Sequence, residues 1–241
     1  MGLSIILKKG IDMSLIQGIK SIFKAKKIEK ENKIREESLK EIDLDDNKHF
    51  GLKLGRFVEV KTLQTKLGSF LFEMEGESSR IEAYGSVDLG SGEVLHKYYL
   101  YNDSYIQLHE IHGVIERVQW FYFDHSDTLS DTYIKSFFEN PGQDYHEKLV
   151  YREQEYSSVW AEKNEDGTVN VRPVHLQETY VKIDQPKAEI ICQHYLHLYE
   201  RVVEGTEFYE YLIREVEEGD DYFSEVYTLG IDVKETDIIV T

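Results

Sequence analysis

Residues 80–123, RIEAYGSVDLGSGEVLHKYYLYNDSYIQLHEIHGVIERVQWFYF, carry the clearest structural signal in this 241-residue chain. Apolar and polar residues alternate along the segment, and turn signals interrupt it at Gly-Ser-Gly, Asn-Asp and His-Gly. Alternation with a period of two is typical of half-buried strands, and closely spaced turns join antiparallel neighbours. The segment therefore predicts a meander of four strands, at 80–87, 94–101, 105–111 and 114–123.

Outside this meander the pattern is interrupted once and then returns. Tyr133, Ile134, Phe137 and Phe138 share one helical face, Ser130 can cap it, and Asn-Pro-Gly at 140–142 ends it, which predicts a short helix near 130–138. Further strands are predicted at 70–74, 149–159, 159–163, 169–174, 179–183, 188–203, 208–216 and 222–229. We expect a mainly β (α+β) fold whose antiparallel meander sheets form one large curved sheet system or two β subdomains.

Charge is divided unevenly along the chain. The first 40 residues contain ten Lys and Arg against five Asp and Glu, whereas the other 201 contain 18 against 41. We expect residues 1–47 to be a basic helical arm with a charged linker, and residues 48–241 to be an acidic β body that could divide near 140. The body's charge argues against nucleic acid, because phosphate is bound through Lys and Arg. Solvation of the surface is the simpler interpretation, and an acidic docking surface is the alternative.

The arm has the spacing of an amphipathic helix. Its apolar face contains Leu15, Ile16, Ile19, Ile22 and Phe23. The same segment contains Lys20, Lys24, Lys26 and Lys27, of which Lys20, Lys24 and Lys27 lie on or beside the opposite face. Such a helix can lie in an anionic membrane interface or contact a partner helix. Packing on its own domain, or fraying, is the alternative. Met13, directly ahead of the helix, has the setting of a protein start, so residues 1–12 are predicted to be an upstream extension.

The usual catalytic and metal-binding motifs do not emerge from the sequence. A single cysteine, Cys192, excludes an intramolecular disulfide and a Cys-rich zinc site, and its apolar surroundings predict a buried, inert thiol. No nucleophile elbow is present, and the longest apolar run is far shorter than the roughly 18 residues of a spanning helix. We expect a cytoplasmic protein, which could be peripheral to the inner face of the cell membrane, and no cofactor.

Histidine is a common metal ligand, and this chain contains nine histidines. Those around the predicted strands are His96, His109, His112, His125, His194 and His197, with Glu110 between two of them. Histidines three apart on a strand point to opposite faces, and HEIH lacks the spacing of four found on a metalloprotease helix. We therefore expect ordinary histidines and no metal.

A small-ligand pocket is a separate possibility. The glycine-rich run at 85–92 lies between two predicted strands and lacks a phosphate-loop pattern, so a tight hairpin turn is favoured over a nucleotide loop. Aromatic residues on the strands could line a groove, although core packing is the default. If the curved sheet binds a ligand, the candidate residues are Asp88, His96, Tyr98, Tyr99, Asp103 and Trp120.

Several segments together resemble the YjfK-like family of uncharacterised bacterial proteins, over roughly residues 50–235. The resemblance rests on GLKLG at 51–55, IEAYGSVDLG at 81–90, KYY at 97–99, ND at 102–103, IQL at 106–108, LYER at 198–201, EF at 207–208 and TLGID at 228–232. It implies a genomic neighbourhood that includes a phage-shock-protein-A-like membrane-coat protein. It implies no catalytic residues and no cofactor.

The leading hypothesis is a non-enzymatic accessory or adaptor protein in a bacterial envelope-stress or membrane-maintenance system. Its arm would contact the membrane or a coat-protein partner, and its body would hold a protein partner. The alternatives are a small-ligand binder or enzyme with a pocket in the curved sheet, and a subunit that assembles through its C-terminal strands.

Overall fold

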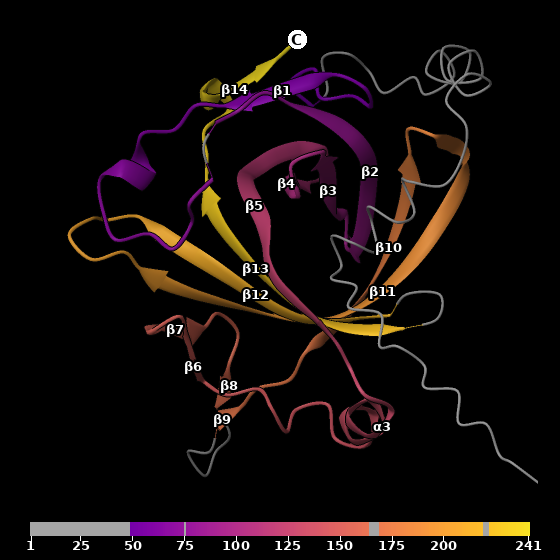
Figure 1. Ribbon diagram of the computed structural model, residues 1–241, viewed down its shortest axis with the longest axis vertical. Coiled ribbons are helices and arrows are strands. Elements are labelled where there is room, and N and C mark those ends of the chain that lie inside the picture. The colour runs from indigo at the N-terminus through magenta and orange to yellow at the C-terminus, as the bar shows by residue number, and fades with distance from the viewer. Residues whose placement is uncertain (1–48, 75, 164–168, 219–221) are drawn as a thin grey trace, which may run out of the picture.

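Eight strands form a closed antiparallel barrel (Figure 1). The computed structural model describes residues 49–74, 76–163, 169–218 and 222–241. Neighbours around the barrel follow the order β2, β3, β4, β5, β13, β12, β11 and β10, and β10 pairs back onto β2. The strands are β2 (Ser79–Gly90), β3 (Glu93–Leu100), β4 (Ser104–Ile111), β5 (Val114–Thr128), β10 (Val174–Lys182), β11 (Gln185–Val202), β12 (Tyr209–Glu218) and β13 (Phe223–Asp232).

The remaining elements cover the outside of the barrel. Strands β1 (Phe57–Val60) and β14 (Ile238–Val240) extend the sheet from β2, whereas β7 (Gln154–Ser158) and β6 (Lys148–Tyr151) extend it from β11. A separate hairpin pairs β8 (Glu162–Lys163) with β9 (Val169–Asn170). Helix α3 (Asp131–Glu139) follows β5, and short 3-10 turns occupy Gln64–Lys66 and Glu235–Asp237.

The predicted antiparallel meander is confirmed, and so is the short helix near 130–138. The hydroxyl oxygen of Ser130 accepts a hydrogen bond from the backbone N–H of Tyr133 at 3.3 Å, as expected of an N-cap. The glycine-rich run forms the hairpin between β2 and β3, where Gly90, Ser91 and Gly92 all have positive φ. The expected N-terminal helix lies outside the described residues.

Two of the predicted strands were wrong. Residues 70–74 form no strand, because the N–H of Phe72 donates to the Glu210 carboxylate at 2.6 Å instead of to a neighbouring strand. Residues 149–159 form the hairpin of β6 and β7, which turns at Arg152 and Glu153 with φ of 45° and 66°. Arginine and glutamate are not typical turn residues, so the alternation of apolar and polar residues does not predict this turn.

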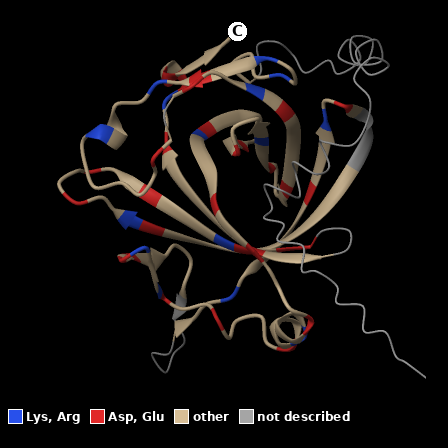
Figure 2. Ribbon diagram, in the orientation of Figure 1, with Lys and Arg blue, Asp and Glu red and all other residues tan. Residues whose placement is uncertain are grey.

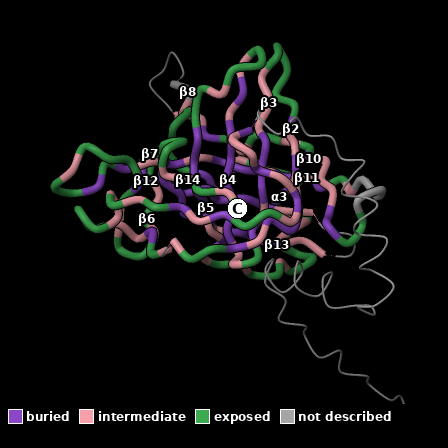
Figure 3. The backbone as a smooth tube through the Cα atoms, turned by 90° about the horizontal axis from the view of Figure 1, so that it is seen from above, coloured by how far each residue is buried: buried purple, intermediate pink, exposed green. Residues whose placement is uncertain are grey.

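Side chains alternate between the interior of the barrel and its outer face. The interior holds a cluster built around Tyr105, Phe121, Tyr211 and Val226. The outer face carries a larger cluster that packs under residues 50–74. A third cluster lies around Phe137 of α3. Buried residues follow the middle of the strands, while turns are exposed (Figure 3). The barrel wall is therefore buried on both faces along much of its length.

Strands from both sides of residue 140 share this barrel, because β5 pairs with β13.

Acidic and basic residues are interspersed over the strands and loops (Figure 2). Among the described residues, no helix has the length and apolar character needed to cross a membrane.

Candidate functional site

A cavity of about 60 Å³ lies inside the barrel. Aromatic side chains from four strands form much of its wall: Tyr99 of β3, Tyr105 of β4, Phe123 of β5 and Tyr180 of β10. Tyr99 and Tyr180 are half-buried, so they lie toward the solvent side of the cavity. A water molecule needs roughly 15 Å³ by this measure, so the space admits a few waters or one small ligand.

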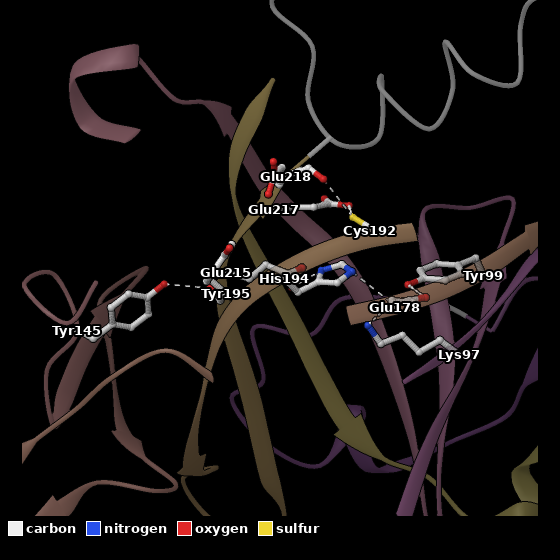
Figure 4. A network of polar contacts seen from close by, with 10 residues as sticks. All are labelled: Lys97, Tyr99, Tyr145, Glu178, Cys192, His194, Tyr195, Glu215, Glu217 and Glu218. Carbon is white, nitrogen blue, oxygen red and sulfur yellow. Dashed lines mark hydrogen bonds and ion pairs between the residues drawn. The ribbon is translucent and has the colours of Figure 1, made fainter. Parts of the chain in front are cut away.

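A buried ion pair lines this cavity and joins two strands of the barrel wall that are not neighbours. The ammonium of Lys97 on β3 lies 2.7 Å from the Glu178 carboxylate on β10, and the hydroxyl of Tyr99 donates to the same carboxylate at 2.7 Å (Figure 4). Strand β2 runs between β3 and β10, and its Gly85 pairs with Lys97 on one side and Tyr180 on the other. A Cβ at Gly85 would lie 1.8 Å from Glu178 Oε1. Glycine is therefore required here so that the carboxylate can reach across β2.

His194 on β11 connects this pair to a second carboxylate. Its Nε2 lies 3.4 Å from Glu178 Oε2, and its Nδ1 lies 3.2 Å from Glu215 Oε2 on β12 (Figure 4). Burial alone would lower the pKa of His194, but Cys192 and the two carboxylates raise it well above its ordinary value. His194 therefore lies between two carboxylates that favour its protonated form.

Cys192 of β11 and Glu217 of β12 extend the network along these two strands. The Cys192 thiol donates to Glu217 Oε1 at 3.1 Å. Burial, followed by the nearby Glu217 charge, raises the pKa of the thiol to about 12. Burial raises the pKa of Glu217 to about 7. The positive charge of His194 opposes this shift, and repulsion from Glu215 adds to it. The thiol is therefore unreactive at neutral pH, whereas Glu217 exchanges a proton there.

The Lys97 and Glu178 charges hold each other ionised. Burial would raise the pKa of Glu178, but Lys97 and His194 lower it to about 2. Burial would lower the pKa of Lys97, yet Glu178 and Glu215 raise it. Both groups are nearly inaccessible to water, so removing one charge would leave the other unpaired at high cost.

Two groups of described residues have metal-ligand chemistry. One is Cys192, His194 and Glu217. Its imidazole nitrogens already face Glu178 and Glu215, and its thiol donates to Glu217, so these contacts would have to break and release protons before a metal could bind. The other is His49, His96 and Glu110, all buried on the outer face of the barrel wall. This second group fits a metal better.

The structure distributes the six predicted pocket residues over several places. Tyr99 and Asp103 line the interior cavity. His96 and Tyr98 lie together on the opposite, outer face, where both approach His49.

The other two candidates lie elsewhere. Trp120 is buried on the outer face and borders an external groove, with its indole N–H donating to Ser104 at 3.2 Å. Asp88 is exposed in the β2–β3 hairpin and accepts from the Gly90 N–H at 2.8 Å. Residues 15–27, which include the predicted membrane or partner contacts, lie outside the described residues.

The ionic network itself was not predicted. Lys97, Glu178 and Glu215 lie on three strands that are distant in sequence, and each resembles an ordinary charged residue on a half-exposed strand. The sequence did place His194 and His197 on opposite faces, and this is confirmed. His197 hydrogen-bonds to Ser158 at 2.7 Å outside the barrel, whereas His194 faces the interior.

The fold and the site together define a closed antiparallel barrel with an ionic, aromatic-walled interior. The sequence model of a family described as protein of unknown function, DUF2491, matches residues 22–239, so this chain belongs to that family. No curated protein and no solved structure matches the chain. Membership in an uncharacterised family is therefore confirmed, while the YjfK-like name and its genomic neighbourhood stay predictions.

Proposed function

We propose that this protein binds a small organic cation, such as a primary or quaternary ammonium ion, inside its barrel. The observation that carries the proposal is a small cavity with aromatic walls and an excess of carboxylates. Its charged lining comprises Glu82, Asp103, Glu178, Glu215 and Glu217 against Lys97, Lys182 and His194. Arg80 pairs with Glu82. Carboxylates therefore outnumber cations among the residues that line the cavity.

Aromatic faces in this cavity already lie near cations. The Lys97 ammonium lies 5.6 Å from the centroid of the Tyr105 ring, and the Lys182 ammonium lies 5.4 Å from that of Tyr180. Attraction between a cation and an aromatic quadrupole contributes about 0.5–2 kcal/mol, with the larger value in desolvated sites. The same walls would favour a bound ammonium ion over a neutral molecule of equal size.

Glu217 gives the proposed site a pH dependence. Its carboxyl oxygen Oε2 is buried, and its pKa is about 7. Below this pKa Glu217 holds a proton and is neutral, so a cationic ligand must displace that proton to pair with the carboxylate. Affinity is therefore expected to rise by up to about tenfold per pH unit toward pH 7 and then level off.

Titration calorimetry with methylammonium, ethanolamine and choline at pH 6, 7 and 8 tests the proposal. We expect at least one ion to bind with this pH dependence and Glu217→Gln to weaken binding at pH 8. Glu218→Gln is the matched control, because Glu217 lines the cavity whereas its neighbour Glu218 does not. Absence of binding by all three ions, or equal binding by Glu217→Gln and the native protein, would refute the proposal.

A second proposal is the adaptor role implied by the family resemblance. We propose that the protein serves a bacterial envelope-stress or membrane-maintenance system, with residues 1–40 contacting an anionic membrane or a coat-protein helix. A groove of about 1210 Å³ beside residues 61–74 supports a binding role for the body. Leu63 and Leu67 on its rim are 74% and 64% exposed, and exposed apolar patches are typical of interaction surfaces.

Flotation with anionic liposomes tests the membrane form of the adaptor proposal. The full chain is expected to float and a chain lacking residues 1–40 to remain at the bottom, because the lysines of the arm would lie at the headgroups. Equal recovery of the two proteins would remove membrane contact from the proposal.

A further inference from the structure

Three side chains with metal-ligand chemistry converge on the outer face of the barrel, separated from the interior cavity by the wall. His96 belongs to β3 and Glu110 to β4, and His49 comes from the turn that precedes β1. The Nε2 atoms of His49 and His96 lie 3.5 and 3.4 Å from Glu110 Oε2. All three ligand atoms lie within 4.8 Å of one another.

These distances suit a shared metal ion. Zinc binds imidazole nitrogen and carboxylate oxygen at about 2.0–2.2 Å, and a tetrahedron of that size separates its ligand atoms by about 3.4 Å. Two histidines and one carboxylate form a known ligand set for Zn²⁺ and for other divalent transition metals. The oxygen-preferring ions Ca²⁺ and Mg²⁺ would not select two imidazoles.

Two tyrosines fix the orientation of the histidines. The Nδ1 of His49 lies 2.5 Å from the hydroxyl of Tyr98, and the Nδ1 of His96 lies 2.7 Å from the hydroxyl of Tyr84. Both Nδ1 atoms are thus engaged away from Glu110, and both Nε2 atoms face it. Hydrogen bonds of this kind set the tautomer and ring orientation of metal-binding histidines.

Local structure also holds His49 in place. The His49 carbonyl accepts a hydrogen bond from the Leu52 N–H at 2.9 Å, which closes a turn in which Phe50 and Gly51 have positive φ. Leu52 is 2% exposed and belongs to the large outer core cluster. The turn therefore delivers an imidazole to the wall at a fixed position.

We propose that His49, His96 and Glu110 bind a divalent transition-metal ion, with Zn²⁺ as the best fit. The exposed fractions of these residues are 4%, 7% and 8%, so the ion would be shielded from bulk water, and its three protein ligands would leave a fourth position for one water molecule. The ion would attach the turn that contains His49 to β3 and β4.

Zinc binding by the full-length protein tests this inference. The protein is stripped with a chelator, and Zn²⁺ affinity is measured by competition with a chromophoric chelator, with Co²⁺ absorption as a report of tetrahedral nitrogen and oxygen ligation. We expect His96→Gln and Glu110→Gln each to weaken Zn²⁺ binding at least 100-fold. His109→Gln is the matched control, since His109 also lies on β4 and faces one carboxylate, Glu93, at 3.3 Å.

Tyr98→Phe keeps the aromatic ring and removes only the hydroxyl that orients His49, so it tests the site without deleting a ligand. A 10- to 100-fold loss of Zn²⁺ affinity is expected, with an unchanged circular dichroism spectrum. Failure of the stripped native protein to bind Zn²⁺ would overturn the inference, and the cluster would then be a proton-mediated ion pair. Equal affinities of native protein, His96→Gln and Tyr98→Phe would overturn it as well.

Discussion

Replacement of Lys97 by methionine isolates the energetics of the barrel interior. The side chain keeps similar length and loses its ammonium, which leaves the Glu178 carboxylate buried beside the Tyr99 hydroxyl and His194. Breaking a buried pair from one side commonly costs 3–5 kcal/mol, because the remaining charge is no longer compensated.

The pKa of Glu178 gives an independent magnitude. It is held at about 2, whereas an ordinary glutamate titrates near ~4.3. The difference corresponds to about 3 kcal/mol of stability. This contribution is present above the unfolded-state pKa and is lost as the pH falls through about 2. We expect Lys97→Met to lower the free energy of unfolding by about 3 kcal/mol at pH 7.5, and the midpoint temperature by roughly 6–12 °C.

Urea denaturation followed by tryptophan fluorescence measures the change. The double variant Lys97→Met/Glu178→Gln should regain at least half of the lost stability, because it removes the orphaned charge. Lys148→Met is the matched control, since Lys148 pairs with Glu155 on the surface and should change stability little. A Lys97→Met protein within about 1 kcal/mol of the native one, or a double variant whose losses simply add, would refute the reasoning.

Three further predictions concern the same network. Gly85→Ala should destabilise the fold by about 2–3 kcal/mol in urea denaturation, because the new methyl group collides with the Glu178 carboxylate; native-like stability would contradict it. Since the folded-state pKa of Glu217 is raised to about 7, the folded state binds the extra proton, so stability should fall as pH rises from about 4.5 to 7. Glu217→Gln should flatten that decline, and an unchanged pH profile would count against the assignment. Because the pKa of the Cys192 thiol is about 12, its reaction with iodoacetamide at pH 8 should be about 1000-fold slower in the native than in the urea-unfolded protein. Mass spectrometry measures the two rates, and comparable rates would show that the thiol is accessible.

The wall strand β3 shows how one short sequence serves two sites. Along His-Lys-Tyr-Tyr at 96–99, His96 and Tyr98 face the outer cluster, whereas Lys97 and Tyr99 face the interior. The period-two rule predicts this division from the sequence. The identity of the facing groups is not predictable in this way, because Glu178 and His49 come from elements distant in the chain.

The predicted ligand pocket illustrates the same limit. Tyr99 and Asp103 do line the cavity, but His96 and Tyr98 lie across the wall from it, and Asp88 caps a hairpin. The candidates therefore include residues from both faces of one sheet. In β3, the even positions 96 and 98 face the outer cluster and the odd positions 97 and 99 face the interior.

The sequence by itself determined the local structure: the strands of the meander, the helix capped by Ser130 and the hairpin at Ser91, because each depends on side-chain periodicity and on turn residues close in the chain. The tertiary structure alone decided that β10 closes the barrel against β2, and that closure brings Glu178 to Lys97. The same is true of the approach of His49 to His96 and Glu110. Pairing between distant strands depends on the packing of the whole core, and a buried charge shows its partner only once both have left water.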